Sequence, residues 1–284
     1  MSNLNAIEIK GLTKSYNGFT LENLDLTLPG GCILGLIGEN GAGKSTTIKL
    51  ILDMIKRDGG SVKILGRDNS AEIKMIKEDV GTVFDEVGIP ECLNAVQVGK
   101  IMRGTFKRWN PVFYKGLLER LSVPIDKPFG KLSRGNKMKL GLAVAMSHNA
   151  KLLLLDEATS GLDPVVRDDV LDILNEFTRN EEHSVLMSSH IVSDLEKICD
   201  YIAFLHKGKL ILFEEKDALL AEYGVIHCTA ERLAELDPAA IKHKKITPYG
   251  AEAIVKRSAV PSGTEISPVS IEELFVQTTK GEVL

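Results

Sequence analysis

The stretch GENGAGKS at residues 38–45 decides how the rest of this 284-residue chain is interpreted. An apolar run at residues 32–37 precedes it, and apolar residues at helical spacing follow it over residues 44–54. Between a strand and a helix, a GxxxxGK[ST] pattern predicts a phosphate-binding loop, because its glycines let successive backbone N–H groups face one anion. The lysine brings an ammonium group to the β- and γ-phosphates, and the serine offers a hydroxyl to Mg²⁺. The predicted nucleotide-binding residues are Gly38, Glu39, Asn40, Gly41, Ala42, Gly43, Lys44, Ser45 and Thr46.

Two acidic residues end a second apolar run. Asp156 and Glu157 directly follow the leucines at residues 152–155. In nucleoside triphosphatases with a phosphate-binding loop, such an aspartate binds Mg²⁺ directly or through its water ligands. We therefore assign Asp156 to the metal together with Ser45. Adjacent residues at a strand end project differently, which lets Glu157 address the attacking water. Without the phosphate loop, the same two acids would be an ordinary solvated strand end; with it, the sequence predicts hydrolysis of Mg²⁺-ATP.

Strands and helices alternate along most of the chain, which predicts an α/β fold with a mainly parallel sheet. Residues 6–9 and 20–28 alternate as β-structure. Residues 86–131 have helical spacing punctuated by prolines, and we interpret them as an inserted, mostly helical subdomain. Residues 220–284 contain prolines, a basic cluster and only weak strand patterns. We predict that they form a small α+β appendix that ends in a helix at 270–279. Further strands are predicted at residues 62–65, 80–84, 152–155, 184–188, 201–205 and 209–213, and further helices at 135–147, 166–179 and 191–199.

Bulk composition narrows the class of protein. The chain is 44% hydrophobic and 26% charged, which is ordinary for a globular protein. Its formal net charge of -4 argues against a nucleic-acid partner, since such proteins are usually basic. The first residues lack the apolar core of a secretory signal, and no apolar run approaches the ~20 residues of a membrane span. We therefore expect a cytoplasmic protein whose membrane role, if it has one, goes through a partner.

Several further motifs follow in a fixed order. Their residues are Leu132-Ser133-Arg134-Gly135-Asn136, Asp156-Glu157, Ser160-Gly161-Leu162-Asp163 and His190. With the phosphate loop, they make the sequence resemble the ATP-binding cassette proteins, the ATPase subunits of ABC transporters, over about residues 6–219. The resemblance implies a RecA-like core with an antiparallel β part and a helical subdomain at about residues 86–147. We thus predict a cassette domain over residues 1–219 and an accessory region over 220–284.

The resemblance also implies roles for individual residues. Glu157 and His190 would be catalytic, with His190 as the switch histidine near the γ-phosphate, and Tyr16 would stack on adenine. The cassettes of this family pair head to tail, so each ATP lies between the phosphate loop of one copy and the signature of the other. Because the chain has one loop and one signature, a homodimer is the simplest working unit. The signature residues that would act in trans are Ser133, Arg134, Gly135 and Asn136.

The partner implied by the resemblance is a separate integral membrane permease, docked chiefly through the helical subdomain. The protein would then be peripheral to the inner face of the cell membrane. The order and the residues of the motifs resemble those of cassettes that serve ABC-2-type exporters of Gram-positive bacteria. By analogy with that group, antimicrobial peptides are candidate cargoes. Two alternatives stay open: a regulatory cassette that binds ATP with weak hydrolysis, and a cassette protein of translation or DNA repair that is not part of a transporter.

Three positions depart from the family pattern: Asp85, Arg134 and Asn136, the last of which stands where glutamine is common in the signature. Asp85 stands where the family usually has a glutamine, either as a ligand of the metal or water or as a solvated loop acid. Arg134 stands where glycine is common in the signature, and it would meet a phosphate or an acid across the dimer, or only solvent. Both alternatives remain open at the level of sequence.

Overall fold

A six-stranded sheet in the order β10-β9-β3-β8-β7-β6 forms the centre of the computed structural model, which describes residues 4–247, 250–261 and 263–279. The edge strand β10 is antiparallel to its neighbour, and the other five strands are parallel. Because the carboxyl ends of parallel strands share one edge of a sheet, the segments that follow β3, β6, β7 and β8 converge there. The strands are β3 (Ile33–Gly38), β6 (Val80–Val83), β7 (Leu152–Asp156), β8 (Ser184–Ser189), β9 (Tyr201–His206) and β10 (Lys209–Glu215).

Both faces of this sheet are buried, which explains its uninterrupted apolar strands. In β3, Leu34 and Leu36 face a core shared with a second sheet, whereas Ile33 and Ile37 face a core shared with the helices. The leucines of β7 divide between the same two cores. Period-two alternation therefore sorts a continuous apolar run onto two packed layers.

The second sheet is antiparallel, in the order β2-β1-β4-β5. It shares its core with helix α1 (Lys44–Ile51), which follows the phosphate loop. Helix α1 is shorter than predicted because Leu52 is its C-cap and Asp53 adopts a left-handed conformation with φ 51°. The short helix α2 (Ile73–Asp79) was not predicted, since Ile76 is its one buried residue. The strands of this sheet are β1 (Ile7–Tyr16), β2 (Phe19–Leu28), β4 (Gly59–Ile64) and β5 (Arg67–Asp68).

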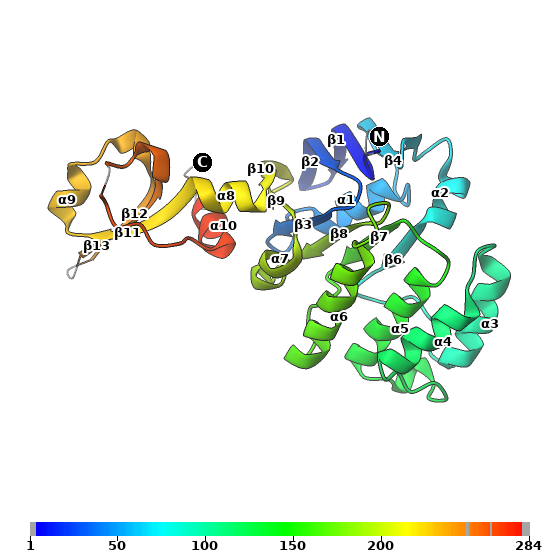
Figure 1. Cartoon of the computed structure of the whole chain (residues 1–284). Helices are drawn as coiled ribbons and strands as arrows, with labels where there is room; N and C mark the ends of the chain where they lie inside the picture. The colour runs from blue at the N-terminus through cyan, green and yellow to red at the C-terminus, as the bar shows by residue number, and fades with distance from the viewer. Residues whose placement is uncertain (1–3, 248–249, 262, 280–284) are drawn as a thin grey trace.

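The predicted helical insertion is confirmed as α3 (Ala95–Thr105), α4 (Pro111–Arg120), the 3-10 turn η1 (Phe129–Lys131) and α5 (Arg134–Met146). Local sequence fixes where these helices begin. Asn94 and Gln97 form a reciprocal capping box at α3, and Asn110 caps α4 ahead of Pro111. Two more helices, α6 (Pro164–Phe177) and α7 (Val192–Ile198), flank the sheet beside this insertion, as Figure 1 shows.

The C-terminal region is an α+β unit, as the sequence predicts, and Figure 1 shows it extending away from the central sheet. Helix α8 (Lys216–Glu222) leads into a three-stranded antiparallel sheet in the order β11-β13-β12. Helix α10 (Ile271–Thr279) then returns to pack against α7, and its Phe275 ring lies 5.2 Å from the ring of Phe204 in β9. The remaining elements are β11 (Tyr223–Cys228), α9 (Ala230–Ala234), η2 (Pro238–Ala240), β12 (Ile241–Thr247), β13 (Gly250–Lys256) and η3 (Arg257–Ala259).

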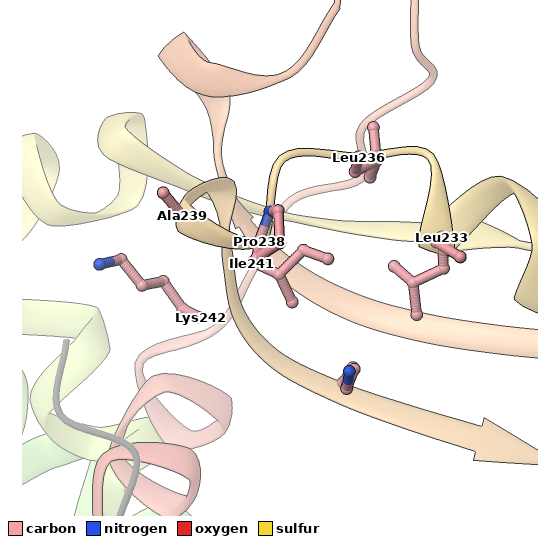
Figure 2. A pocket seen from close by; sticks show the side chains of 8 residues that line it. Leu233, Leu236, Pro238, Ala239, Ile241 and Lys242 are labelled. Carbon is pink, nitrogen blue, oxygen red and sulfur yellow. The ribbon is translucent and has the colours of Figure 1, made fainter.

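A pocket of about 540 Å³ lies on this C-terminal unit, between α9 and β12 (Figure 2). Leu233, Leu236 and Ile241 supply apolar lining, and Lys242 and Lys244 add positive charge. Elsewhere, within the part of the chain that the structure describes, no helix is long and apolar enough to cross a membrane.

Candidate active site

The phosphate loop joins the carboxyl end of β3 to the start of α1, as its motif predicts. Two of its glycines have left-handed backbone conformations, with φ 81° at Gly41 and φ 113° at Gly43. A Cβ on Gly43 would also lie 3.0 Å from Cζ of Phe19. The loop conformation therefore depends on glycine at these positions.

Lys44 is buried, and its ammonium group lies under the loop. Its Nζ donates hydrogen bonds to the carbonyl oxygens of Gly38 at 2.7 Å and Glu39 at 3.3 Å. It also forms an ion pair with Oε1 of Glu157 at 3.1 Å. The loop lysine and the predicted general base are thus in direct contact, although 113 positions separate them in the chain (157 − 44).

Asp156, the last residue of β7, and Glu157, which follows it, both contact one residue of the neighbouring strand. Ser188 of β8 donates a hydrogen bond from Oγ to Oδ1 of Asp156 at 2.6 Å. The backbone N–H of Glu157 donates to the carbonyl oxygen of Ser188 at 3.1 Å, and it lies 3.2 Å from the same Oγ. Glu157 itself has φ 54°, a conformation that costs free energy in a non-glycine residue. Ser188 therefore positions the Asp156 carboxylate and the backbone of Glu157.

His190 follows β8 and contacts the same glutamate. Its Nδ1 lies 2.6 Å from Oε2 of Glu157, so the two carboxylate oxygens of Glu157 are divided between Lys44 and His190. The imidazole is half-exposed. Of the predicted catalytic residues, the structure therefore brings Glu157 and His190 together beside the phosphate loop.

Glu157 and Lys44 line a cavity of about 480 Å³, whereas His190 is not part of its lining. Its lining contains both acids after β7 and most of the predicted loop residues, together with Asp85. The full lining is Phe19, Glu39, Asn40, Gly41, Gly43, Lys44, Ser45, Thr46, Asp85, Asp156 and Glu157. Four carboxylates and one ammonium group thus face this space. The arrangement suits an anion only if further positive charge enters with it, as a divalent cation would.

The residues present fit Mg²⁺ as that cation. Ser45 offers a hydroxyl and Asp156 a carboxylate oriented by Ser188. Mg²⁺ prefers oxygen ligands and commonly takes one or two from protein and the rest from phosphates and water. In keeping with this sparse donor set, no cluster of three or more His, Cys, Asp or Glu that could hold a metal occurs among the described residues.

An aromatic residue that the sequence analysis missed lies at the cavity. Phe19 lines it, whereas the predicted adenine-stacking residue Tyr16 does not. The two are register partners at the β1–β2 turn, and the Tyr16 ring is 46% exposed with the Lys14 ammonium 5.4 Å from its centroid. The only sequence signal for Phe19 was its place three residues after Tyr16. Tyr16 therefore lies near the cavity with an open face, and its role stays a prediction.

The signature residues lie at the start of α5. Ser133 is the N-cap and accepts a hydrogen bond from the Asn136 backbone N–H at 3.3 Å. Ser133, Gly135 and Asn136 do not line the cavity of their own chain. Arg134 makes an ion pair with Asp85, which is in the same chain. This contact within one chain was not predicted, and about half of each side chain remains exposed. The predicted contact of Arg134 across a dimer stays a prediction.

Comparisons with known proteins relate this chain to ABC transporters. Residues 21–160 match the family model described as ABC transporter. The lantibiotic transport ATP-binding protein SrtF of Streptococcus pyogenes is 34% identical over 214 residues, which are 74% of this chain and 91% of the relative. The ABC transporter ATP-binding protein YtrB of Bacillus subtilis is 28% identical over 97% of this chain and 99% of its own length.

Solved structures support the same fold. A dimeric ATP-binding cassette in a post-hydrolysis state, bound to ADP and Pi, matches with a TM-score of 0.67 at 20% identity. The match covers 74% of this chain and 98% of that cassette. At this identity, the likeness shows the fold alone.

Proposed function

Because this chain belongs to the ABC transporter family, as an ATP-binding subunit with ATP hydrolase activity, we propose that it works as a homodimer that powers a separate membrane permease. One observation carries the proposal: a single cavity brings together the phosphate loop, Asp156 and Glu157. Each of these groups is the residue type that ATP hydrolysis requires at that place. The regulatory alternative, with weak hydrolysis, lacks any such support, because Glu157 and His190 are both in position.

The chain's own residues would share the work as follows. The backbone N–H groups of the loop and the Lys44 ammonium would bind the phosphates, with Lys44 exchanging its ion pair with Glu157 for a phosphate oxygen. Ser45 and Asp156 would hold Mg²⁺, which neutralises phosphate charge when bound. Glu157, freed from Lys44, would accept the proton of the attacking water at a carboxylate oxygen. His190 would hold the other oxygen of Glu157 and so fix its orientation.

A second copy would complete the site. Ser133, Gly135 and Asn136 lie outside the cavity of their own chain, at the N-terminus of the 13-residue helix α5. A helix N-terminus attracts anions, so this end of α5 suits the γ-phosphate held by another copy. One of the similar solved structures is a dimer of ATP-binding cassettes, which supports the pairing of two copies.

The helical subdomain supplies a surface for the permease. A mostly apolar groove of about 270 Å³ runs between α3 and α4, with Trp109 and Tyr114 in its lining and Lys100, Arg103 and Lys115 at its edge. It would accept an apolar segment with acidic flanks. Docking there would place the chain at the inner face of the cell membrane. The lantibiotic transport protein among the relatives favours an exporter, with peptides as the class of cargo to test first.

Substitution of Glu157 tests the hydrolytic part of this proposal. Glu157→Gln removes the base and leaves the loop intact, so ATP binding should persist while turnover falls by about 100-fold or more. We expect the variant to accumulate as an ATP-bound dimer, measured by size-exclusion chromatography with light scattering. Lys44→Ala is the control, because it should lose binding itself. Turnover of Glu157→Gln near that of the unmodified chain would refute the role of Glu157.

A further inference from the structure

Asp85 and Arg134, both of which depart from the family pattern, form an ion pair with each other. Asp85 lies two residues beyond β6, and Arg134 is the first residue of α5, 49 positions along the chain. The Arg134 Nη2 donates a hydrogen bond to Oδ1 of Asp85. Each side chain is about half exposed. The unusual acid and the unusual base are therefore explained together rather than separately.

Arg134 has a second contact that fixes its guanidinium. It lies directly over Gly161, where an added Cβ would be 3.1 Å from Nε and 3.2 Å from Cζ. Gly161 also has φ 67°, so the close approach and the backbone conformation both require glycine. Arg134 is thus held between Asp85 and the segment that follows Glu157. The bond to Asp85 and the packing against Gly161 together restrict the position of the Arg134 side chain.

The ion pair between Arg134 and Asp85 changes the charge that a bound nucleotide would meet in the cavity. Asp85 is one of four carboxylates in the lining, and Glu157 already has Lys44 as its partner. A bare carboxylate a few ångströms from a nucleotide phosphate repels it. At the dielectric of a half-exposed site, one such charge changes an equilibrium about three- to tenfold. An arginine bonded to the carboxylate cancels most of this repulsion.

We propose that Arg134 is a positioning residue for its own chain: it neutralises Asp85 and holds it at the rim of the cavity, so that ATP binds beside a neutral pair. This inference rests on the proposed function of the cavity as the ATP site. The pair then stands in for a single uncharged polar side chain at the position of Asp85. It follows that losing Arg134 alone harms ATP binding more than losing both residues.

A double-mutant cycle tests the pair by binding rather than by activity. The four proteins are the unmodified full-length chain, Asp85→Asn, Arg134→Gln and the double variant. Equilibrium affinity for a fluorescent ATP analogue is measured in EDTA, where metal coordination plays no part, at low and high salt. We expect Arg134→Gln to weaken binding about three- to tenfold. Asp85→Asn should bind at least as tightly as the unmodified chain, and the double variant should return to within about twofold of it.

Binding at high salt and binding by Arg134→Lys, which keeps the positive charge, test whether the effect is electrostatic. The loss in Arg134→Gln should shrink at high salt, because screening weakens the repulsion from the bare Asp85, and Arg134→Lys should recover part of it. An equal loss on removing Arg134 with or without Asp85, or no loss at all, would overturn the inference. Lys44→Ala separates this failure from failure of the proposed function: if that variant binds ATP as well as the unmodified chain, the cavity is not the ATP site.

Discussion

At the scale of single residues, the site depends on a serine that carries no motif name. Ser188 donates to Asp156, and its backbone carbonyl accepts from Glu157. It is fully buried, so water is a poor substitute for the hydroxyl. The predicted metal ligand and the predicted base therefore share one support on the neighbouring strand, and a small change there should affect both.

Ser188→Ala should lower turnover about tenfold or more and raise the Mg²⁺ concentration needed for half-maximal rate, because Asp156 loses the bond that orients it. ATP affinity in EDTA should stay near that of the unmodified chain, since the loop is untouched. Steady-state ATPase assays across Mg²⁺ concentrations measure the first effect, and analogue binding measures the second. Ser184→Ala is a matched control, because Ser184 is a buried serine of the same strand whose Oγ accepts from Gly31. Equal turnover in the two variants would contradict the role of Ser188.

At the scale of elements, a buried histidine, His148, lies where the helical subdomain meets helix α2. His148 follows α5 and stacks on Phe106, just after α3, with ring centroids 4.0 Å apart and planes within 7°. Its Nδ1 lies 3.2 Å from the Glu78 carbonyl oxygen, so that nitrogen carries the proton in the neutral ring. Burial lowers the pKa of His148 below its ordinary value, although the bond to Glu78 acts in the opposite direction. The folded structure at this junction therefore favours the neutral form of His148 over the protonated form.

The lowered pKa predicts a stability loss in mild acid. The unfolded chain takes up a proton at His148 once the pH falls below about 6.5, whereas the folded chain resists it. The contribution of His148 is thus fully present above that pH and declines below it. Between pH 6.5 and 5.5 the free energy of unfolding should fall, and one histidine can contribute at most ~1 kcal/mol to this loss. Chemical denaturation of the unmodified chain and of His148→Phe, which keeps an aromatic ring, measures it; the same pH dependence in both would contradict the assignment.

At the scale of the whole molecule, the core does not stop where the sequence placed the end of the cassette. Leu219 and Tyr223 belong to the same apolar cluster as Leu195 and Phe204 near the nucleotide site. Ile271 and Leu274 of α10 complete that cluster and are almost fully buried. Helix α7, which begins two residues after His190, is thus covered by the C-terminal helix. Removing residues beyond 219 would strip this cover, so such a truncation would not isolate an intact cassette.

Ile271→Ala should therefore lower the free energy of unfolding by about 2–4 kcal/mol, as expected for a cavity in a continuous core. Ile246→Ala, in the same C-terminal region but on an exposed side chain of β12, should change it by less than about 0.5 kcal/mol. Denaturant titration of the full chain measures both. A loss below about 1 kcal/mol in Ile271→Ala would show that α10 is independent of the cassette.

The amino-acid sequence by itself determined the α/β class, the helical insertion and the phosphate loop of this protein. Those features depend on local rules: glycines within eight positions, alternation along one strand, and caps such as Asn94 at the first turn of a helix. The predicted strands over residues 152–155 and 184–188 are confirmed for the same reason, because short apolar runs mark strands buried on both faces. The predicted roles of Tyr16 and of the signature in trans remain predictions.

Only the tertiary structure decided which side chains meet. Asp156 and Ser188 are 32 positions apart, and Asp85 and Arg134 are 49 apart. No periodicity or motif spacing encodes such contacts, because they depend on the order of strands in the sheet and on how α5 packs against it. The same is true of α10, whose burial against α7 depends on the path of the chain through the C-terminal sheet. Local sequence patterns therefore identified the phosphate loop and the fold class. Long-range packing decided which side chains pair around that loop and which charges they leave in the cavity.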